Sequence, residues 1–272
     1  MKKIAIVPTL LTLGNAVCGF AAIAYVSRIS MDAPGSNEHY FAIAGWLIVA
    51  AMLFDALDGY VARLSRSTSH FGAELDSLCD SISFGLAPAF LILKMGPGWE
   101  PSATMHQLLA CVAALYMICA LLRLARFNVE TSNDSLGHKR FRGLPSPAAA
   151  GCIASLAILR GALATHWSHL DVGNIHGILE VWVTLGGFAV ALLMVSRIPY
   201  PKQFLAPFLR GRRHFGHLVH VVLAFFVLFA LRELAVILCF WMYAIGVAAR
   251  YGVARSLRRL PQPAGMEDVF RP

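Results

Sequence analysis

Long apolar runs separated by short polar segments dominate the pattern of hydrophobic and polar positions along the chain. A run of about 20 apolar residues is long enough to cross the hydrocarbon core of a bilayer as an α-helix. The pattern therefore predicts an all-α fold, a polytopic transmembrane bundle of about eight spans. The predicted spans are residues 8–29, 40–64, 72–94, 105–128, 146–165, 177–196, 214–231 and 233–255.

The two ends of the chain differ from the rest of the pattern. Lys2 and Lys3 precede the first apolar run, but no small-residue cleavage site follows, so we expect a first transmembrane helix rather than a signal peptide. We assign residues 1–255 to one integral-membrane domain. Residues 256–272 show no periodicity and are predicted to form a disordered cytoplasmic tail.

The distribution of basic residues predicts the orientation, because cytoplasmic loops carry an excess of lysine and arginine. With both termini in the cytoplasm, only four of the 23 basic residues fall on the other side. A seven-span arrangement would place the basic segment 250–259 on the wrong side. We therefore expect a multi-pass protein of the cytoplasmic (inner) membrane. The four exceptions are Arg28, Lys94, Arg160 and Arg232.

Composition supports this interpretation and limits the possible partners. The chain is 58% hydrophobic and 14% charged, with mean hydropathy +0.65, whereas soluble domains carry about 25% charged residues. The net charge of +8 could suggest a nucleic-acid partner only if it formed one basic patch on a soluble face. Here the charge is distributed by membrane side, so no nucleic acid is expected.

Four aspartates interrupt the apolar pattern in the second and third predicted spans. Asp55 and Asp58 are spaced i, i+3 with Gly59, Ala62 and Arg63 on the same helix face. Gly72, Asp76 and Asp80 are spaced i, i+4, i+8 on the next helix. The segment that joins the two helices is predicted to be cytoplasmic. Two antiparallel helix ends should therefore bring four carboxylates together near that surface.

Ionised carboxylates at membrane depth cost about 2.5–3.5 kcal/mol each, and Arg63 alone cannot balance four of them. Hard oxygen ligands favour Mg²⁺, Mn²⁺ or Ca²⁺, and four carboxylates can hold two divalent ions, an arrangement suited to displacement at phosphorus. Mg²⁺ usually binds substrate phosphate as well, so Arg63 would pair with phosphate. There are two alternatives to a catalytic metal site. The aspartates could line a polar seam between helices and pair with basic residues, or they could bind a divalent cation during transport.

The pattern D-x-x-D-G-x-x-A-R-x8-G-x-x-x-D-x-x-x-D, from Asp55 to Asp80, resembles that of the CDP-alcohol phosphotransferases at every position. In this family an alcohol displaces CMP from a CDP-linked lipid. The resemblance implies a metal site of Mg²⁺ or Mn²⁺, with Asp80 as both a metal ligand and the general base. It implies the metal ligands Asp55, Asp58, Asp76 and Asp80, and the CDP-diacylglycerol contacts Gly59, Ala62, Arg63 and Gly72.

Flanking segments, over residues 1–150, are most similar to the branch of this family that uses L-serine as the acceptor. Arg123 and Arg126, spaced i, i+3 at the cytoplasmic end of the fourth span, are candidates for binding the serine carboxylate. Their alternative role is to anchor the span by positive charge. Thr12 and Asn15 either face the nucleotide or hydrogen-bond a neighbouring helix.

The resemblance implies metal-dependent transfer of a phosphatidyl group from CDP-diacylglycerol to the serine hydroxyl, giving phosphatidylserine and CMP. It also implies a homodimer, and the predicted orientation places the active site at the cytoplasmic face. The alternatives are the same chemistry with glycerol phosphate or inositol phosphate as the acceptor, or a divalent-cation transporter.

Overall fold

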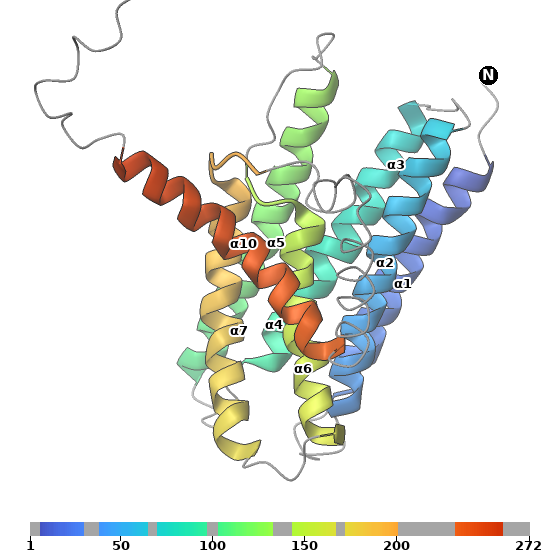
Figure 1. Ribbon diagram of the computed structural model, residues 1–272. Coiled ribbons are helices and arrows are strands. Elements are labelled where there is room, and N and C mark those ends of the chain that lie inside the picture. Colours follow the sequence, from blue (N-terminus) through green and yellow to red (C-terminus); the bar gives the residue numbers. More distant parts are fainter. Residues whose placement is uncertain are drawn as a thin grey trace, which may run out of the picture.

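The structure, a computed structural model, is an assembly of long helices (Figure 1). It describes residues 6–29, 38–64, 70–96, 103–132, 143–166, 172–200 and 232–257. Its elements are α1 (Ile6–Ser27), α2 (Glu38–Leu64), α3 (His70–Asp80), the π-helix η1 (Ser81–Leu86), α4 (Ala87–Met95), α5 (Ala103–Ser132), α6 (Ser146–His166), α7 (Val172–Val195) and α10 (Arg232–Leu257).

The predicted all-α membrane architecture is confirmed over the described residues. Seven helical segments there are long and apolar enough to cross a bilayer, and α3, η1 and α4 run together as one of them, His70–Met95. They correspond to seven of the eight predicted spans. The remaining span, 214–231, lies outside the described residues, as do residues 258–272 of the predicted tail 256–272. The first two residues of that tail are instead the last of α10.

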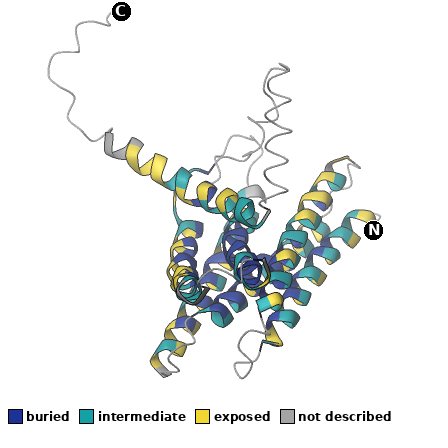
Figure 2. Ribbon diagram, turned by 60° about the horizontal axis from the view of Figure 1, so that its bottom comes forward, coloured by how far each residue is buried: buried dark blue, intermediate teal, exposed yellow. Residues whose placement is uncertain are grey.

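Helix α6 forms the centre of the bundle, where it packs against α2, α7 and α10. Its apolar stretch is 72% buried, compared with 11% for α10. Small residues allow this packing: a Cβ on Gly45 of α2 would lie 2.7 Å from the Ala154 carbonyl of α6. Figure 2 shows buried residues gathered in the middle of the bundle and exposed ones on its outer faces. The outer faces are rich in apolar side chains, as expected of a protein surrounded by lipid.

Arg160 ties four helices together at the end of the bundle where α6 is followed by α7, which we call the Arg160 end. Its guanidinium donates to both carboxylate oxygens of Glu38, at 2.9 and 3.3 Å. It also donates to the Met95 carbonyl at 3.2 Å and lies 3.8 Å from Glu180. The guanidinium carbon stands 4.7 Å from the centroid of the Phe41 ring. The three charged side chains are largely buried, so this cluster is a compensated structural contact among α2, α4, α6 and α7.

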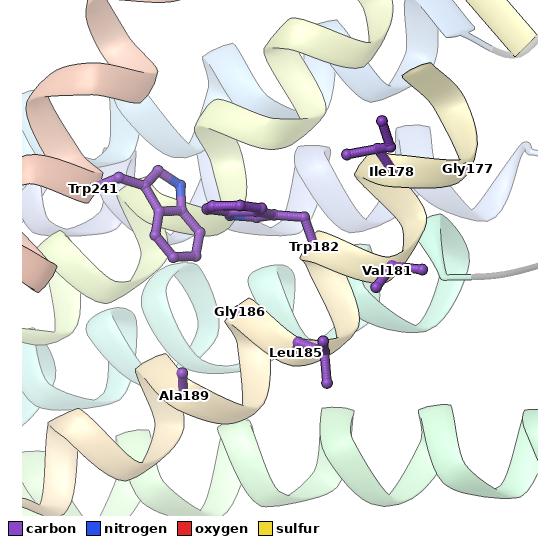
Figure 3. Close-up of a pocket in the computed structure, with 8 residues that line it drawn as sticks. All are labelled: Gly177, Ile178, Val181, Trp182, Leu185, Gly186, Ala189 and Trp241. Carbon is purple, nitrogen blue, oxygen red and sulfur yellow. The ribbon is translucent and has the colours of Figure 1, made fainter. Parts of the chain in front are cut away.

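Helices α7 and α10 frame an apolar groove of about 640 Å³ (Figure 3). The Trp182 and Trp241 rings meet edge to face there, with centroids 5.4 Å apart. A Cβ on Gly186 would lie 2.5 Å from the Trp241 ring, so glycine is required for this contact. The groove suits hydrocarbon and offers no charged group for a nucleotide. The lining residues are Gly177, Ile178, Val181, Trp182, Leu185, Gly186, Ala189 and Trp241.

We predict that Arg160→Met destabilises the protein strongly, because it leaves Glu38 and Glu180 buried without their cation. Breaking a buried ion pair in this way costs about 3–5 kcal/mol. The free energy of unfolding in detergent micelles measures the effect. Arg28→Met is the matched control, since Arg28 is exposed and lies over the Tyr25 ring at 5.4 Å. Equal losses in the two variants would contradict a stabilising role for the Arg160 cluster.

Candidate active site

The carboxylates of the motif gather where α2 and α3 lie side by side, at the opposite end of the bundle from Arg160. Asp55 and Asp58 come from α2, and Asp76 and Asp80 come from α3. One carboxylate oxygen each from Asp55, Asp76 and Asp80 falls within a group whose members are at most 4.8 Å apart. Asp58 lies within electrostatic range of Asp76 and Asp80. The helical spacing thus brings three of the four predicted metal ligands into one group, with Asp58 outside it.

Two of these aspartates carry buried oxygens that have no hydrogen-bond partner, Asp58 Oδ2 and Asp76 Oδ1. A buried acceptor without a partner is costly, and costlier still when it belongs to an ionised group. Three converging carboxylates repel one another unless a cation lies among them. The donor set therefore fits a hard divalent cation, which takes carboxylate oxygens as ligands. The sequence pattern identified these residues as ligands for the same reason.

Helix α1 supplies polar partners to the carboxylates from the opposite side. Asn15 is fully buried, and its Nδ2 donates to Asp80 Oδ1 at 2.9 Å. The Thr12 hydroxyl donates to the Pro8 carbonyl at 3.0 Å and lies within hydrogen-bonding reach of the Asp58 carboxylate. The structure therefore places Thr12 and Asn15 against a neighbouring helix, one of the two roles considered for them. The Oδ1 atom of Asn15 is buried and has no hydrogen-bond partner.

A π-helix begins directly after Asp80. The Ala87 amide donates to the Ile82 carbonyl, five residues earlier, which marks the wider turn. Pro88 has no amide hydrogen, so it cannot give the Phe84 carbonyl the usual i+4 hydrogen bond. The Tyr116 hydroxyl of α5 donates to that carbonyl instead, at 3.2 Å. The extra residue in the turn sets the aspartate face of α3 at a different angle from the core face of α4.

The π-helix touches α1 closely. The Ser83 hydroxyl donates to the Asn15 carbonyl at 2.9 Å. A Cβ on Gly19 would lie 2.7 Å from Ser83 Cα, a distance that real Cβ atoms do not show. Backbone therefore approaches backbone at this point, and the approach holds Asn15 against Asp80.

Of the two arginines proposed for serine, the structure brings Arg123 to the carboxylates. Its Nη1 donates to the Ser146 hydroxyl at 2.7 Å, and it lies within electrostatic range of Asp80. Its Nε is buried without a partner. Arg126 pairs instead with Glu130 at 2.8 Å on its own helix, where both side chains are more than a third exposed. Exposed pairs of this kind contribute little stability, so a ligand could displace Glu130.

A tight turn fixes the position of Ser146, the first residue of α6. Gly143 adopts φ +89°, and a Cβ there would collide with the Met194 carbonyl. The Gly143 amide donates to the Ile198 carbonyl at 2.9 Å, and the Leu144 amide to the Leu193 carbonyl at 3.0 Å. The start of α6, and with it the partner of Arg123, is thereby held against the end of α7.

The residues predicted to contact CDP lie on the two aspartate-bearing helices. Gly59 and Ala62 are half-buried near the end of α2, and Gly72 is half-buried near the start of α3. Arg63 follows in the last turn of α2, and its side chain lies outside the described part of the structure. The helices thus carry this set beside the carboxylates, as the motif spacing predicts.

Sequence reasoning missed the supports behind the aspartates. Ser77 of α3, which follows Asp76 and precedes Asp80 by three residues, exchanges hydrogen bonds with Asn128 of α5 at 2.8 and 3.1 Å. The π-helix and the Tyr116 bond to it were also missed. Pro88 was the available signal, because a proline inside a helical pattern removes a backbone hydrogen bond.

These features define a membrane-embedded helical enzyme site with a cluster of metal-competent carboxylates, and the comparisons with known proteins agree. The family model described as CDP-alcohol phosphatidyltransferase matches residues 5–197. The chain belongs to this family.

Several curated proteins are similar to the chain over most of its length. It is 35% identical to the CDP-diacylglycerol--serine O-phosphatidyltransferase of Helicobacter pylori, over 72% of the chain and 71% of that protein. It is 32% identical to the Mycobacterium tuberculosis protein of the same name, over 73% of the chain and 62% of that protein. It is 36% identical to the archaetidylserine synthase of Methanothermobacter thermautotrophicus, over 72% of the chain and 69% of that protein.

We predict that Gly19→Ala weakens both stability and activity, because its Cβ forces α1 away from the Ser83 backbone and with it Asn15 from Asp80. Overpacking of this kind costs about 1–3 kcal/mol. Gly246→Ala is the matched control, since a Cβ there meets nothing within 4 Å. The temperature of thermal unfolding and the initial rate of CMP release should both fall for Gly19→Ala and stay unchanged for Gly246→Ala. Unchanged values for Gly19→Ala would show that the contact between α1 and η1 is not needed.

Proposed function

We propose that this protein transfers a phosphatidyl group from CDP-diacylglycerol to the hydroxyl of L-serine and releases CMP. Its membership of the CDP-alcohol phosphatidyltransferase family supports the class of reaction. The names of its relatives, which include serine phosphatidyltransferases and an archaetidylserine synthase, support serine as the acceptor. Within the site, the observation that carries the proposal is that Asp80 groups with Asp55 and Asp76 and also lies within electrostatic range of Arg123.

The carboxylates of Asp55, Asp58, Asp76 and Asp80 would hold Mg²⁺ or Mn²⁺, with room in the donor set for two ions. Bound there, divalent cations supply positive charge that neutralises the diphosphate and polarises the phosphorus under attack. Gly59, Ala62 and Gly72 leave space for the CDP group beside the two helices, and Arg63 pairs with its phosphate. Asn15 Oδ1 offers an acceptor to the nucleotide.

Asp80 acts as the general base. The Asn15 amide donates to its Oδ1, which orients the carboxylate and leaves Oδ2 to accept the proton of the serine hydroxyl. The serine oxygen then forms a bond to the phosphorus that bears diacylglycerol. The bond from that phosphorus to the oxygen of CMP breaks, and the electron pair leaves with CMP.

Arg123 binds the serine carboxylate. Its Nη1 is occupied by Ser146, but its buried Nε has no partner and is matched in geometry to a carboxylate oxygen. Because Arg123 lies near Asp80, a serine held by its carboxylate there would present its hydroxyl to the base. Arg126 is a second candidate, which would have to exchange Glu130 for the substrate.

The proposed placement in the cell follows from charge. Of the four basic residues assigned to the external side, Arg160 is paired at the end opposite the carboxylates. Lys94 donates to the Ile29 carbonyl at 3.4 Å, at that same end. The active site would therefore face the cytoplasm from the inner membrane, with residues 1–255 as its domain. The protein would act as a homodimer, as the family resemblance implies.

We predict that Asp80→Asn lowers kcat by about 10²-fold or more, because the amide keeps the size of the side chain but cannot accept the serine proton. CMP release from CDP-diacylglycerol, measured with purified protein at saturating serine and Mg²⁺ or Mn²⁺, gives the value. Glu74→Gln is the control, since Glu74 is an exposed acid on the same helix. Near-normal turnover in Asp80→Asn would rule out this residue as the base.

We predict that Arg123→Ala raises the serine KM by about 10- to 150-fold, the effect of losing a charged hydrogen bond of about 1.5–3 kcal/mol. The KM for CDP-diacylglycerol should change little, because Arg123 is assigned to the serine carboxylate and not to the diphosphate. Arg126→Ala, measured in parallel, separates the two candidates. Glycerol phosphate and inositol phosphate, tested as acceptors for the wild type, distinguish serine from the other acceptors. CMP release with either one and not with serine would overturn the proposed function.

A further inference from the structure

Helix α10 lies beyond the region that matches the family model, which ends at residue 197. One turn of it is nevertheless held firmly against the family domain. Trp241 Nε1 donates to the Cys152 carbonyl at 3.1 Å, and the Cys152 thiol donates to the Phe240 carbonyl at 3.6 Å. The Tyr200 hydroxyl donates to the Ala244 carbonyl at 2.9 Å. Figure 1 shows α10 crossing α6 obliquely, and these contacts fix the crossing at residues 240–244.

The same turn buries Tyr243 against the bundle, beside the segment 198–200 that holds the turn before α6. Its side chain is buried, at 8% exposure, while its neighbour Met242 is 67% exposed. The Tyr243 ring lies 5.6 Å from the Tyr200 ring, centroid to centroid. The phenol of Tyr243 and the guanidinium of Arg123 lie within electrostatic range of each other. An element outside the family region therefore reaches the arginine assigned to the acceptor.

We propose that Tyr243 of α10 positions the Arg123 guanidinium for the carboxylate of the acceptor, so that α10 helps to determine which alcohol the enzyme uses. This inference rests on the proposed function of Arg123.

The physical argument starts from how Arg123 is held. A guanidinium is planar and binds a carboxylate in a fork only when its plane is fixed. The Ser146 hydroxyl accepts from Nη1 and fixes one point, and rotation about that point would carry Nε away from the ligand. The Tyr243 phenol lies within electrostatic range of the guanidinium, so its dipole favours one orientation of that charge and limits this rotation. Tyr243 is thus a positioning residue, which acts through Arg123 and need not touch the substrate.

The test is Tyr243→Phe, which removes the hydroxyl and keeps the ring that packs on Tyr200. We expect the serine KM to rise about 3- to 10-fold, the range for one neutral hydrogen-bonding group. The value of kcat and the KM for CDP-diacylglycerol should stay within about 2-fold of the wild type. Arg123→Lys abolishes the fork, so adding Tyr243→Phe to it should raise the serine KM no further. Such non-additivity is the mark of a residue that acts through another.

Two further variants on the same part of the fold serve as controls. Tyr251→Phe changes a tyrosine of α10 that is 36% exposed and should leave both KM values unchanged. Tyr200→Phe loosens the anchor of α10 at Ala244 and reports what a structural change alone does to Tm and to the serine KM. If Tyr243→Phe matches Tyr200→Phe in both quantities, or lowers Tm in step with activity, Tyr243 only packs the helix and the proposal is wrong.

The proposal and the function can fail separately. If wild-type protein releases CMP with serine, and Arg123→Lys raises the serine KM while Tyr243→Phe does not, only the role of Tyr243 is overturned. If Tyr243→Phe acts additively with Arg123→Lys, the two residues do not work through one another and the proposal is again overturned. If the wild type shows no serine-dependent release of CMP, the proposed function fails, and the role of Tyr243 with it.

Discussion

The placement of four carboxylates, two buried and two half-buried, among apolar helices is the constraint on which the rest of the structure depends. Each costs about 2.5–3.5 kcal/mol at membrane depth even on lenient scales, so each requires compensation. Asn15 and Thr12 supply part of it from α1, and two oxygens are left for a cation. The close packing of α1 on η1 follows from this requirement, because the polar partners must come within hydrogen-bonding distance of a face that is otherwise apolar.

The two ends of the bundle meet the same cost of buried charge in different ways. At the Arg160 end, acids and base bond to one another directly, and the guanidinium is bonded to carboxylates and a carbonyl. At the other end, charges of one sign converge and several polar atoms have no partner. The first arrangement is complete in itself and stabilises the fold. The second is complete only with ligands, which is the physical difference between a structural cluster and a site.

The sequence was sufficient to predict the helices and the aspartate cluster, because both follow from local spacing. Apolar length predicts a span, and the i, i+3 and i, i+4 spacing of Asp55, Asp58, Asp76 and Asp80 predicts a shared face. Which neighbour each face meets is a tertiary property that spacing does not contain. For this reason Asn15 could not be assigned between nucleotide and neighbouring helix, and Arg123 could not be separated from Arg126. The π-helix had a local cause in Pro88, but its partner Tyr116 lies 32 residues from Phe84.

The π-helix has a consequence for how this chain can change in length. The segment His70–Met95 runs unbroken from the aspartates to the Met95 carbonyl that Arg160 holds, so both of its ends are fixed. Removing one residue outside the wider turn of 81–86, which already absorbs an extra residue, would rotate one end against the other by about 100°, the angle per residue of an α-helix. Asp76 and Asp80 would then point away from α2, or Met95 away from Arg160. Insertions and deletions in this helix outside the wider turn are therefore excluded even where individual substitutions are tolerated.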